Sequence, residues 1–410
     1  MMKWVNRMDP VLTGVAALAS MLGVFFVWNA GYVQSARDGW LIPRDPLMQF
    51  GFFVVGVAAH FWIARKTPEQ LRKWATPALL ASVGLLAAVL LIGSERNGAK
   101  RWIGYGSIGF QPSDFSKVAI ILALAVGLAI AFQRLEKYRN GEVPRGPGTA
   151  RRRRVDERTA LADWLGPAIL ALASVLLVTG QPDLDTAAVI AAITLGMLFL
   201  GGVSLRVVLG LTICGLAVLG VLAKIKPHAI ARIAAHPHRY EQPYRDGISY
   251  QSVQSEEALR RGGMGGAGFT QGRAKGNLPE ATSDYVMTTV GEEFGFGGFV
   301  VAFSLVALLV GRLWWHAMRH RTVFGKLILG GTAIWIGIQA TINVTMTNGF
   351  LWTMGITMPF YSDGGSSLIA LWIALGLSQA AIASAPQERE VSVAAHRYRW
   401  GHRRPHLPRA

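Results

Sequence analysis

Four carboxylates lie close together in a sequence that is otherwise strongly apolar. Glu280, Asp284, Glu292 and Glu293 all fall within the stretch LPEATSDYVMTTVGEE, and the apolar run 296–310 follows directly. We therefore expect this stretch at a membrane face. A carboxylate in that position is partly desolvated, which raises its basicity and suits it to accept a proton. A carboxylate of this stretch is therefore a candidate general base.

A second group of ionisable residues occurs in NGAKRWIGYGSIGFQPSDFSK, residues 97–117. Gln111-Pro112 predicts a helix start, and Asp114 and Lys117, three residues apart, then share one face of that helix. Ionisable groups in an apolar span are costly and indicate a polar cavity. Two interpretations remain open. The pair contacts substrate, with Lys117 facing an anionic group, or it is an internal ion pair that holds helices together.

A third polar segment, GQPDLDT at residues 180–186, also places Gln-Pro before an apolar run. Helices that begin on one side of a membrane all present positive dipole ends there, and such ends attract anions, including phosphate. Nearby cations strengthen the same tendency. Together these features favour a phosphate-bearing substrate that approaches from the outer leaflet, with Arg101, Lys117, Arg260 and Arg261 as the cations.

The elements that position these residues are predicted to be membrane helices. The mean hydropathy is +0.34, 51% of the 410 residues are hydrophobic and only 16% are charged. Windows of about twenty apolar residues predict an all-α integral membrane protein with about ten transmembrane helices. The first is expected to be retained rather than cleaved as a signal peptide. The expected spans are 11–30, 46–64, 76–93, 113–132, 163–180, 184–202, 206–223, 285–310, 327–347 and 365–385.

The distribution of Lys and Arg predicts the orientation of these spans. Basic residues concentrate in alternate connections and in the tail 389–410, which by the positive-inside rule places both termini in the cytoplasm. The run Arg151–Arg154 is then a topology signal, and the charge of +17 requires no nucleic-acid partner. Residues 1–388 form one polytopic domain. Its large loop, 224–284, lies between the seventh and eighth helices, outside the cytoplasm.

The large loop carries two features of its own. A surface helix is expected over 250–261, and the glycine cluster GGMGGAG at 262–268 follows it. The cluster does not match a phosphate-binding P-loop, so it is interpreted as a flexible hinge. Cys214 is the only cysteine of the chain, so an internal disulfide or a cysteine metal cluster is excluded.

Six motifs in order carry a resemblance to a known family. They are NGAKRW, FQPSDFSK, GQPDLDT, YQSVQSEEALRRGGMGGAGF, LPEATSDYVMTTVGEEFG and MPFYSDGGSS, between residues 97 and 367. In this combination the chain resembles the SEDS family of FtsW, RodA and SpoVE. The resemblance extends from the first expected span to the tenth. The asparagine and glycine ahead of Arg101-Trp102, with Gly291-Glu292-Glu293, favour the FtsW branch over RodA.

The resemblance implies an activity and a set of site residues. It implies a glycosyltransferase of the bacterial inner membrane that polymerises lipid II into peptidoglycan strands for cell division or cell shape. The implied partners are a class B penicillin-binding protein and other division or elongation proteins. The implied catalytic acid aligns with Asp284, which makes Asp284 the candidate general base. Glu280 is then a candidate for orienting the acceptor or, with Asp284, for holding a divalent cation such as Mg²⁺ as a cofactor. The expected substrate-binding residues are Arg101, Trp102, Asp114, Lys117, Gln254, Ser255, Glu280 and Ser366.

Several positions depart from the usual family pattern. Ser283 and Tyr285 flank the catalytic acid in place of the usual threonine and phenylalanine, and carboxylates stand at Asp185 and Asp363 where glycine and tyrosine are usual. These changes predict an unusually acidic cavity. Two other functions also remain open. One is a flippase or transporter for the same lipid-linked precursor, and the other is a catalytically silent scaffold for division or elongation proteins.

Overall fold

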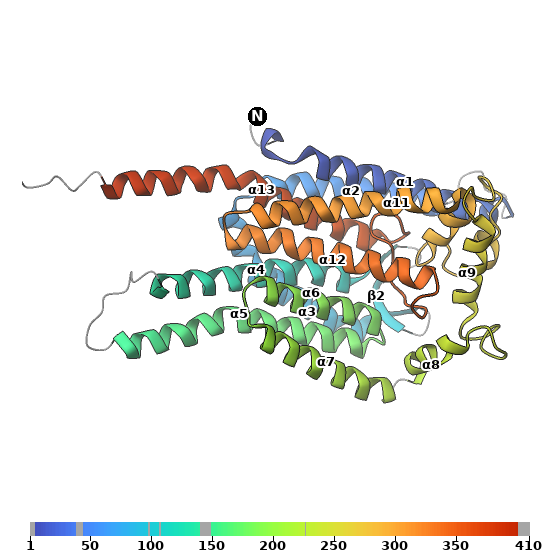
Figure 1. The fold of residues 1–410 in the computed structure, drawn as a ribbon, viewed down its shortest axis with the longest axis horizontal. Coiled ribbons are helices and arrows are strands. Elements are labelled where there is room, and N and C mark those ends of the chain that lie inside the picture. The colour runs from blue at the N-terminus through green and yellow to red at the C-terminus, as the bar shows by residue number, and fades with distance from the viewer. Residues whose placement is uncertain are drawn as a thin grey trace, which may run out of the picture.

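Long apolar helices run side by side along most of the chain (Figure 1). The computed structural model describes residues 5–37, 44–96, 99–105, 108–139, 149–225 and 227–400. In these ranges eight helices are long and apolar enough to cross a bilayer, and two shorter apolar helices accompany them. Each expected span coincides with one of these helices. Their bounds are α1 (Pro10–Arg37), α2 (Arg44–Ala64), α3 (Pro68–Ile92), α4 (Pro112–Arg139), α5 (Thr149–Gly180), α6 (Leu184–Leu200), α7 (Leu205–Ile225), α11 (Val286–Arg319), α12 (Val323–Thr347) and α13 (Gly365–Trp400).

Three helices form the interior of the bundle. In their most apolar windows 78% of the residues of α4, 67% of α12 and 72% of α13 are buried, against 22% for α5 and α11. Some buried polar side chains of these helices find a partner within the same helix. Trp335, for example, is fully buried and donates its ring N–H to Gln339 Oε1 at 2.7 Å. The outer helices expose their apolar side chains, as expected where lipid replaces water.

A small antiparallel sheet, which the predicted all-α fold did not include, lies between α3 and α4. It consists of β1 (Ser94–Arg96), β2 (Ala99–Tyr105) and β3 (Ile108–Phe110), in that order. Ile103 pairs with Phe110 and Tyr105 pairs with Ile108. The aromatic and β-branched residues of RWIGYGSIGF favour strands, although glycines separate them. The sheet places Arg101 and Trp102 at one end of the bundle.

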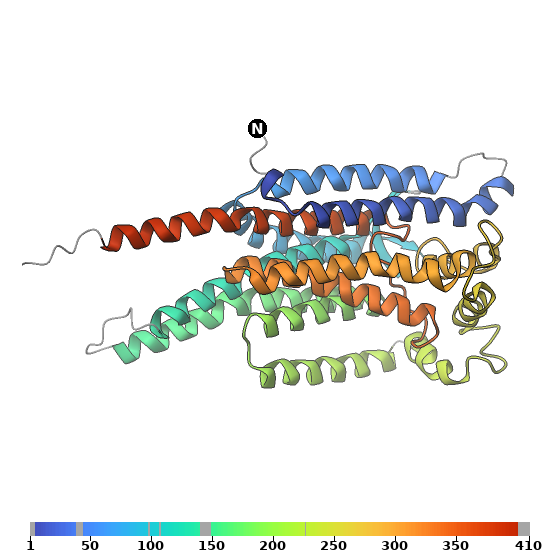
Figure 2. The same cartoon turned by 45° about the horizontal axis from the view of Figure 1, so that its top comes forward.

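The segment between α7 and α11 gathers at the same end, which lies opposite the start of α1 and the end of α13 (Figures 1 and 2). It contains α8 (Pro227–Ala235), a 3₁₀ turn (His236–His238), α9 (Tyr250–Gly262) and α10 (Ala274–Asn277). The expected surface helix over 250–261 is present as α9, and it exposes Arg260 and Arg261. One side of it packs on α11 and buries Ser252, Val253, Ser255, Glu256 and Ala258. α13 continues past the expected boundary at residue 388.

The glycine cluster has a packing role that differs from the expected hinge. α11 is kinked at Gly295, whose φ of 68° is a conformation that glycine adopts readily. The backbone amides of Ala267 and Gly268 donate to the carbonyls of Glu292 and Glu293, at 2.8 and 3.1 Å. The glycines thus allow the loop to approach the kinked helix closely enough to bond carbonyls that the kink leaves free.

Candidate active site

Asp284 lies immediately before α11, and hydrogen bonding of its backbone carbonyl fixes its position. Its carbonyl accepts a hydrogen bond from Asn343 Nδ2 at 2.8 Å, and the same amide donates to the carbonyl of Ile356 at 2.7 Å. The side chain of Asp284 is half-buried, and its carboxylate accepts no hydrogen bond from the residues that the structure describes. A carboxylate that is fixed in position and not engaged elsewhere is available to a substrate.

A second carboxylate, Asp185, faces the same place from the first turn of α6. The backbone N–H of Gly355 donates to Asp185 Oδ2 at 2.7 Å. A methyl group added to Gly355 would lie 3.7 Å from Asp185 Oδ2 and 3.8 Å from Asp284 Oδ2. The two carboxylates therefore converge on one glycine, which keeps the space between them open.

The cation of the site comes from the sheet. Arg101 Nη1 lies 3.4 Å from Asp183 Oδ2, and Gln111 Nε2 lies 3.4 Å from the same oxygen. Asp183 also caps α6, since its Oδ1 accepts from the backbone N–H of Thr186 at 3.2 Å. The Arg101 Nε atom is buried and has no hydrogen-bond partner in the described part of the chain. This unsatisfied donor is suited to an anionic ligand.

The remaining acids line the segment before Asp284. Glu280 is exposed and adopts a φ of 58°, and Ser283 Oγ donates to its Oε2 at 2.6 Å. The backbone N–H of Asp363 donates to the carbonyl of Thr282 at 2.9 Å, which brings the motif before α13 beside the motif before α11. The acids expected on one face are thus assembled from three separate segments.

Burial and mutual repulsion shift the ionisation of this cluster. Burial, reinforced by the negative charge of Glu280, raises the pKa of Asp284 to about 7, while Arg101 opposes the shift. Burial also raises the pKa of Asp363 to about 7, with Asp45 and Glu280 adding to the effect. A carboxylate that titrates near neutrality is a much stronger base than an ordinary aspartate, and it is still ionised in part at pH 7.

The pair Asp114–Lys117 has the geometry of an internal ion pair. Lys117 Nζ lies 2.8 Å from Asp114 Oδ1, and the two residues are only 4% and 5% exposed. The ammonium group also lies 5.4 Å from the centre of the Trp335 ring. Of the two interpretations of this pair, the structure favours the internal ion pair, which lies within α4 and contacts α12 through the Trp335 ring.

Other expected substrate-binding residues occupy structural positions. Ser255 is fully buried, contacts Thr288 Oγ1 at 2.6 Å and donates to the Thr347 carbonyl at 2.7 Å. Ser366 accepts from the backbone N–H of Gln111 at 3.0 Å and so joins α13 to the start of α4. Both serines bind protein groups rather than face open space. Trp102 on β2 and Gln254 on α9 are half-buried, and their assignment to substrate stays a prediction.

Glu292 and Glu293 are fully engaged in holding the loop to α11. Glu292 bonds Arg261 Nε at 2.8 Å and the backbone N–H of Ala274 at 2.7 Å. Glu293 bonds Lys275 Nζ at 2.7 Å and Asn29 Nδ2 at 2.5 Å. Buried charges with this many partners are structural. Of the four acids that opened the sequence analysis, only Glu280 and Asp284 therefore belong to the site.

Sequence reasoning overlooked several residues that build the site. Asp183 could have been found, because an aspartate three residues before Thr186 and an apolar run is a helix-cap signal. Gly355 and Asn343 carry no comparable signal. Their importance comes from the way that the irregular segment 351–358 folds back from α12 towards the start of α11.

A group of three or more His, Cys, Asp or Glu residues that could hold a metal ion is not found within the described residues. Glu280 and Asp284 nevertheless supply two nearby carboxylates. Mg²⁺ is commonly held by one or two carboxylates together with substrate phosphates. The residues therefore fit such an ion only if substrate completes its coordination.

Fold and site together define the class of this molecule. It is a multi-pass membrane protein with a carboxylate-rich site at one end of its helix bundle. The chain belongs to the FtsW, RodA and SpoVE family, because the family described as "FTSW_RODA_SPOVE: Cell cycle protein" matches residues 10–385.

Individual relatives cover nearly the whole chain. A probable peptidoglycan glycosyltransferase FtsW from a Geobacter species is 32% identical over 384 residues, which are 92% of this chain and 97% of that protein. A chain of a peptidoglycan synthase complex that coordinates polymerization and crosslinking has a TM-score of 0.70 at 28% identity, with 93% and 99% of the two chains covered. The rod shape determining protein RodA of Thermus thermophilus has a TM-score of 0.63 at 26% identity, with 92% and 97% covered.

Proposed function

We propose that this protein is a peptidoglycan glycosyltransferase that polymerises lipid II into glycan strands. The names of the relatives support this activity, and similarity over nearly the full length makes its transfer to this chain reasonable. One observation carries the chemistry. Asp284 is fixed by its backbone, makes no side-chain hydrogen bond to the described residues and has a pKa of about 7.

In the proposed reaction Asp284 is the general base. It accepts the proton of an acceptor sugar hydroxyl while that oxygen attacks the anomeric carbon of a second lipid-linked sugar. The bond between this carbon and the pyrophosphate oxygen breaks, and the lipid pyrophosphate departs with the bonding electrons. Because pyrophosphate is already a good leaving group, a general acid is not required. Asp284 then returns its proton to water.

The departing charge needs stabilisation, which Arg101 is placed to supply. Its buried Nε has a free N–H, and its charge reaches Asp284 as well as Asp183. A divalent cation at Glu280 and Asp284 would add electrostatic stabilisation of the pyrophosphate. Chelation with EDTA followed by Mg²⁺ or Mn²⁺ addition tests the cation separately, with polymer yield and pyrophosphate binding as its two readouts.

We place the reaction at the outer face of the bacterial cytoplasmic membrane, with a class B penicillin-binding protein as the partner that crosslinks the product. The charge pattern supports the orientation. Cysteine labelling in a Cys214→Ala background checks it. An impermeant probe should modify a cysteine at position 245 and not one at position 150, and the reverse pattern would place the site on the wrong side.

The decisive experiment is a gel assay for glycan polymer with purified protein, its penicillin-binding protein and lipid II. Polymer that depends on Asp284 supports the proposal. Transport of lipid II across vesicles without any polymer would instead indicate a flippase. If cells expressing Asp284→Asn divide and elongate normally, the protein is a scaffold.

A further inference from the structure

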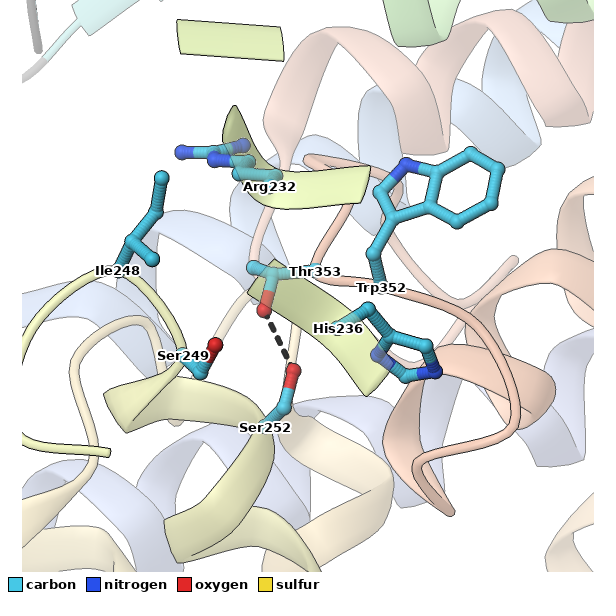
Figure 3. A pocket seen from close by; sticks show the side chains of 7 residues that line it. All are labelled: Arg232, His236, Ile248, Ser249, Ser252, Trp352 and Thr353. Atoms are coloured by element: carbon cyan, nitrogen blue, oxygen red, sulfur yellow. Dashed lines mark hydrogen bonds between the residues drawn. The ribbon is translucent and has the colours of Figure 1, made fainter. Parts of the chain in front are cut away.

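A shallow hollow lies beside the candidate active site, between α8, the start of α9 and the segment that follows α12 (Figure 3). Hydroxyl groups and a guanidinium lie around it, and Ile248 and Trp352 flank it on opposite sides. No carboxylate lines it. The lining residues are Arg232, His236, Ile248, Ser249, Ser252, Trp352 and Thr353.

Arg232, on α8, is the cation of this hollow. Within the described residues it makes no ion pair and no hydrogen bond that would neutralise it, and it is exposed. Its positive charge nevertheless acts on Asp185 and on the Tyr285 hydroxyl. The guanidinium is therefore close to the acid cluster without being paired to it.

Ser249 is a second donor that points to a ligand. It is only 5% exposed, yet its side chain does not cap α9, and its hydroxyl has no hydrogen-bond partner in the described ranges. Figure 3 shows this hydroxyl directed into the hollow. The residue also stands at the N-terminus of α9, a helix of 13 residues whose positive dipole end faces the same point. Because this hydroxyl has no partner among the described residues, it can donate its proton to an oxyanion.

The other hydroxyls connect the hollow to Asp284. Ser252 and Thr353 are 2.8 Å apart, and Tyr285, the neighbour of Asp284, donates to Thr353 Oγ1 at 3.1 Å. Thr353 is two residues before Gly355, the residue on which the two carboxylates converge. Two residues of backbone span at most about 7 Å, so the hollow lies close to the two acids. One saccharide substrate could therefore reach both.

We infer that this hollow binds an oxyanion carried by the saccharide substrate, with the Arg232 guanidinium and the Ser249 hydroxyl as its donors. A carboxylate of the peptide on the sugar and a phosphate of the lipid pyrophosphate share this chemistry. The identity of the saccharide rests on the proposed function, whereas the oxyanion site rests on the hollow itself. Arg232 and Ser249 are binding residues here and are not assigned to proton transfer.

The test measures binding by isothermal titration calorimetry, with the full chain in detergent and Asp284→Asn present so that nothing is turned over. The probes are inorganic pyrophosphate, a soluble disaccharide-peptide and the neutral disaccharide N,N′-diacetylchitobiose. The variants are Arg232→Gln and Ser249→Ala. Arg273→Gln is the matched control, because Arg273 is also exposed and lies outside the hollow.

Arg232→Gln should weaken binding of one anionic probe about tenfold or more, and Ser249→Ala about threefold, while Arg273→Gln changes neither. The probe that is affected identifies the source of the oxyanion. Binding of the neutral disaccharide should not depend on Arg232. If the Arg232→Gln protein does not fold, the affinity of the Ser249→Ala protein for the anionic probes decides whether the site exists.

Equal affinities of the Arg232→Gln and Arg273→Gln proteins for both anionic probes would overturn the inference. Polymerisation by the chain with Asp284 intact separates this outcome from a failure of the proposed function. If the protein forms polymer but Arg232→Gln does not change binding, the oxyanion site is refuted and the proposed function stands. If binding depends on Arg232 but no polymer forms, the glycosyltransferase assignment is refuted and the oxyanion site stands.

Discussion

Asp185 and Asp284 direct their carboxylates at the same residue, Gly355, from two segments that are distant in the sequence. The amide of Gly355 engages Asp185, whereas the described residues leave the carboxylate of Asp284 without a hydrogen bond. The two acids are therefore not equivalent. Asp185 is partly committed to the backbone, and Asp284 is the one that a substrate hydroxyl can reach as a base.

The first prediction concerns Asp284→Asn. The amide keeps the shape and polarity of the side chain but cannot take a proton, so we expect polymerisation to fall about 10²- to 10⁴-fold with lipid II binding largely kept. Glycan polymer is measured at matched expression and matched partner binding. Asp363→Asn and Asp185→Asn are the controls and should cost much less. A near wild-type rate for Asp284→Asn with a severe loss for Asp363→Asn would move the base to Asp363.

The second prediction is an opposite response of activity and stability to pH. Because the pKa of Asp284 is raised from 3.8 to about 7, kcat/KM should rise as pH increases through 7 and the base ionises. The folded state holds this proton more tightly than the unfolded chain does. Its contribution to stability is thus fully present below about pH 4 and is lost as pH rises through 7. Asp363 adds to the same trend.

Thermal unfolding in detergent between pH 5 and pH 8 checks the stability part. Asp284→Asn should reduce the pH dependence of the unfolding temperature, and the part that remains should come from Asp363. An unfolding temperature that rises steadily from pH 5 to pH 8 and is unaltered in Asp284→Asn would contradict a raised pKa.

The third prediction concerns the pair Asp114–Lys117. Lys117→Met leaves a buried carboxylate without its partner, which should cost about 3–5 kcal/mol of stability. The double change Asp114→Leu with Lys117→Met removes both charges and should recover most of that loss. Unfolding temperature and lipid II affinity are measured on all three variants. If stability recovers in the double variant but lipid II affinity does not, Lys117 contacts the substrate after all.

The fourth prediction compares two glycines of the cluster 262–268. A methyl group at Gly262 would lie 2.1 Å from the carbonyl oxygen of Gly291, whereas one at Gly265 meets nothing within 4 Å. Gly262→Ala should therefore destabilise the protein by about 1–3 kcal/mol or prevent folding, and Gly265→Ala should be tolerated. Expression level and unfolding temperature distinguish them. Equal tolerance of both changes would favour the hinge interpretation over close packing.

The helices were predictable because each is a long apolar run, and the membrane requires such runs to form helices. Gln111-Pro112 and Asp183 mark helix starts by local chemistry, which depends only on near neighbours in the sequence. The short sheet was missed, since RWIGYGSIGF is brief and rich in glycine. The family resemblance, rather than any periodicity, singled out Asp284 among four acids.

The parts that escaped prediction depend on contacts between distant segments. Sequence spacing correctly placed Asp114 and Lys117 on one helical face, but it did not show that α12 covers that face and brings the Trp335 ring near the ammonium group. Arg232 and Ser249 likewise became notable only when the segment after α12 was found beside them. Tertiary packing decides such cases, and one sequence contains too little information about it.

Asn343 has a mechanical consequence. Its single amide group holds the carbonyls of Asp284 and Ile356 at once, so the residue before α11 and the chain that follows α12 are fastened to each other. Neither can be displaced alone without breaking a buried hydrogen bond. A force applied at the end of α12 that bears Asn343, for example by a bound protein, would therefore shift the acid and the Gly355 amide together, and the spacing between proton acceptor and substrate would change in one concerted movement.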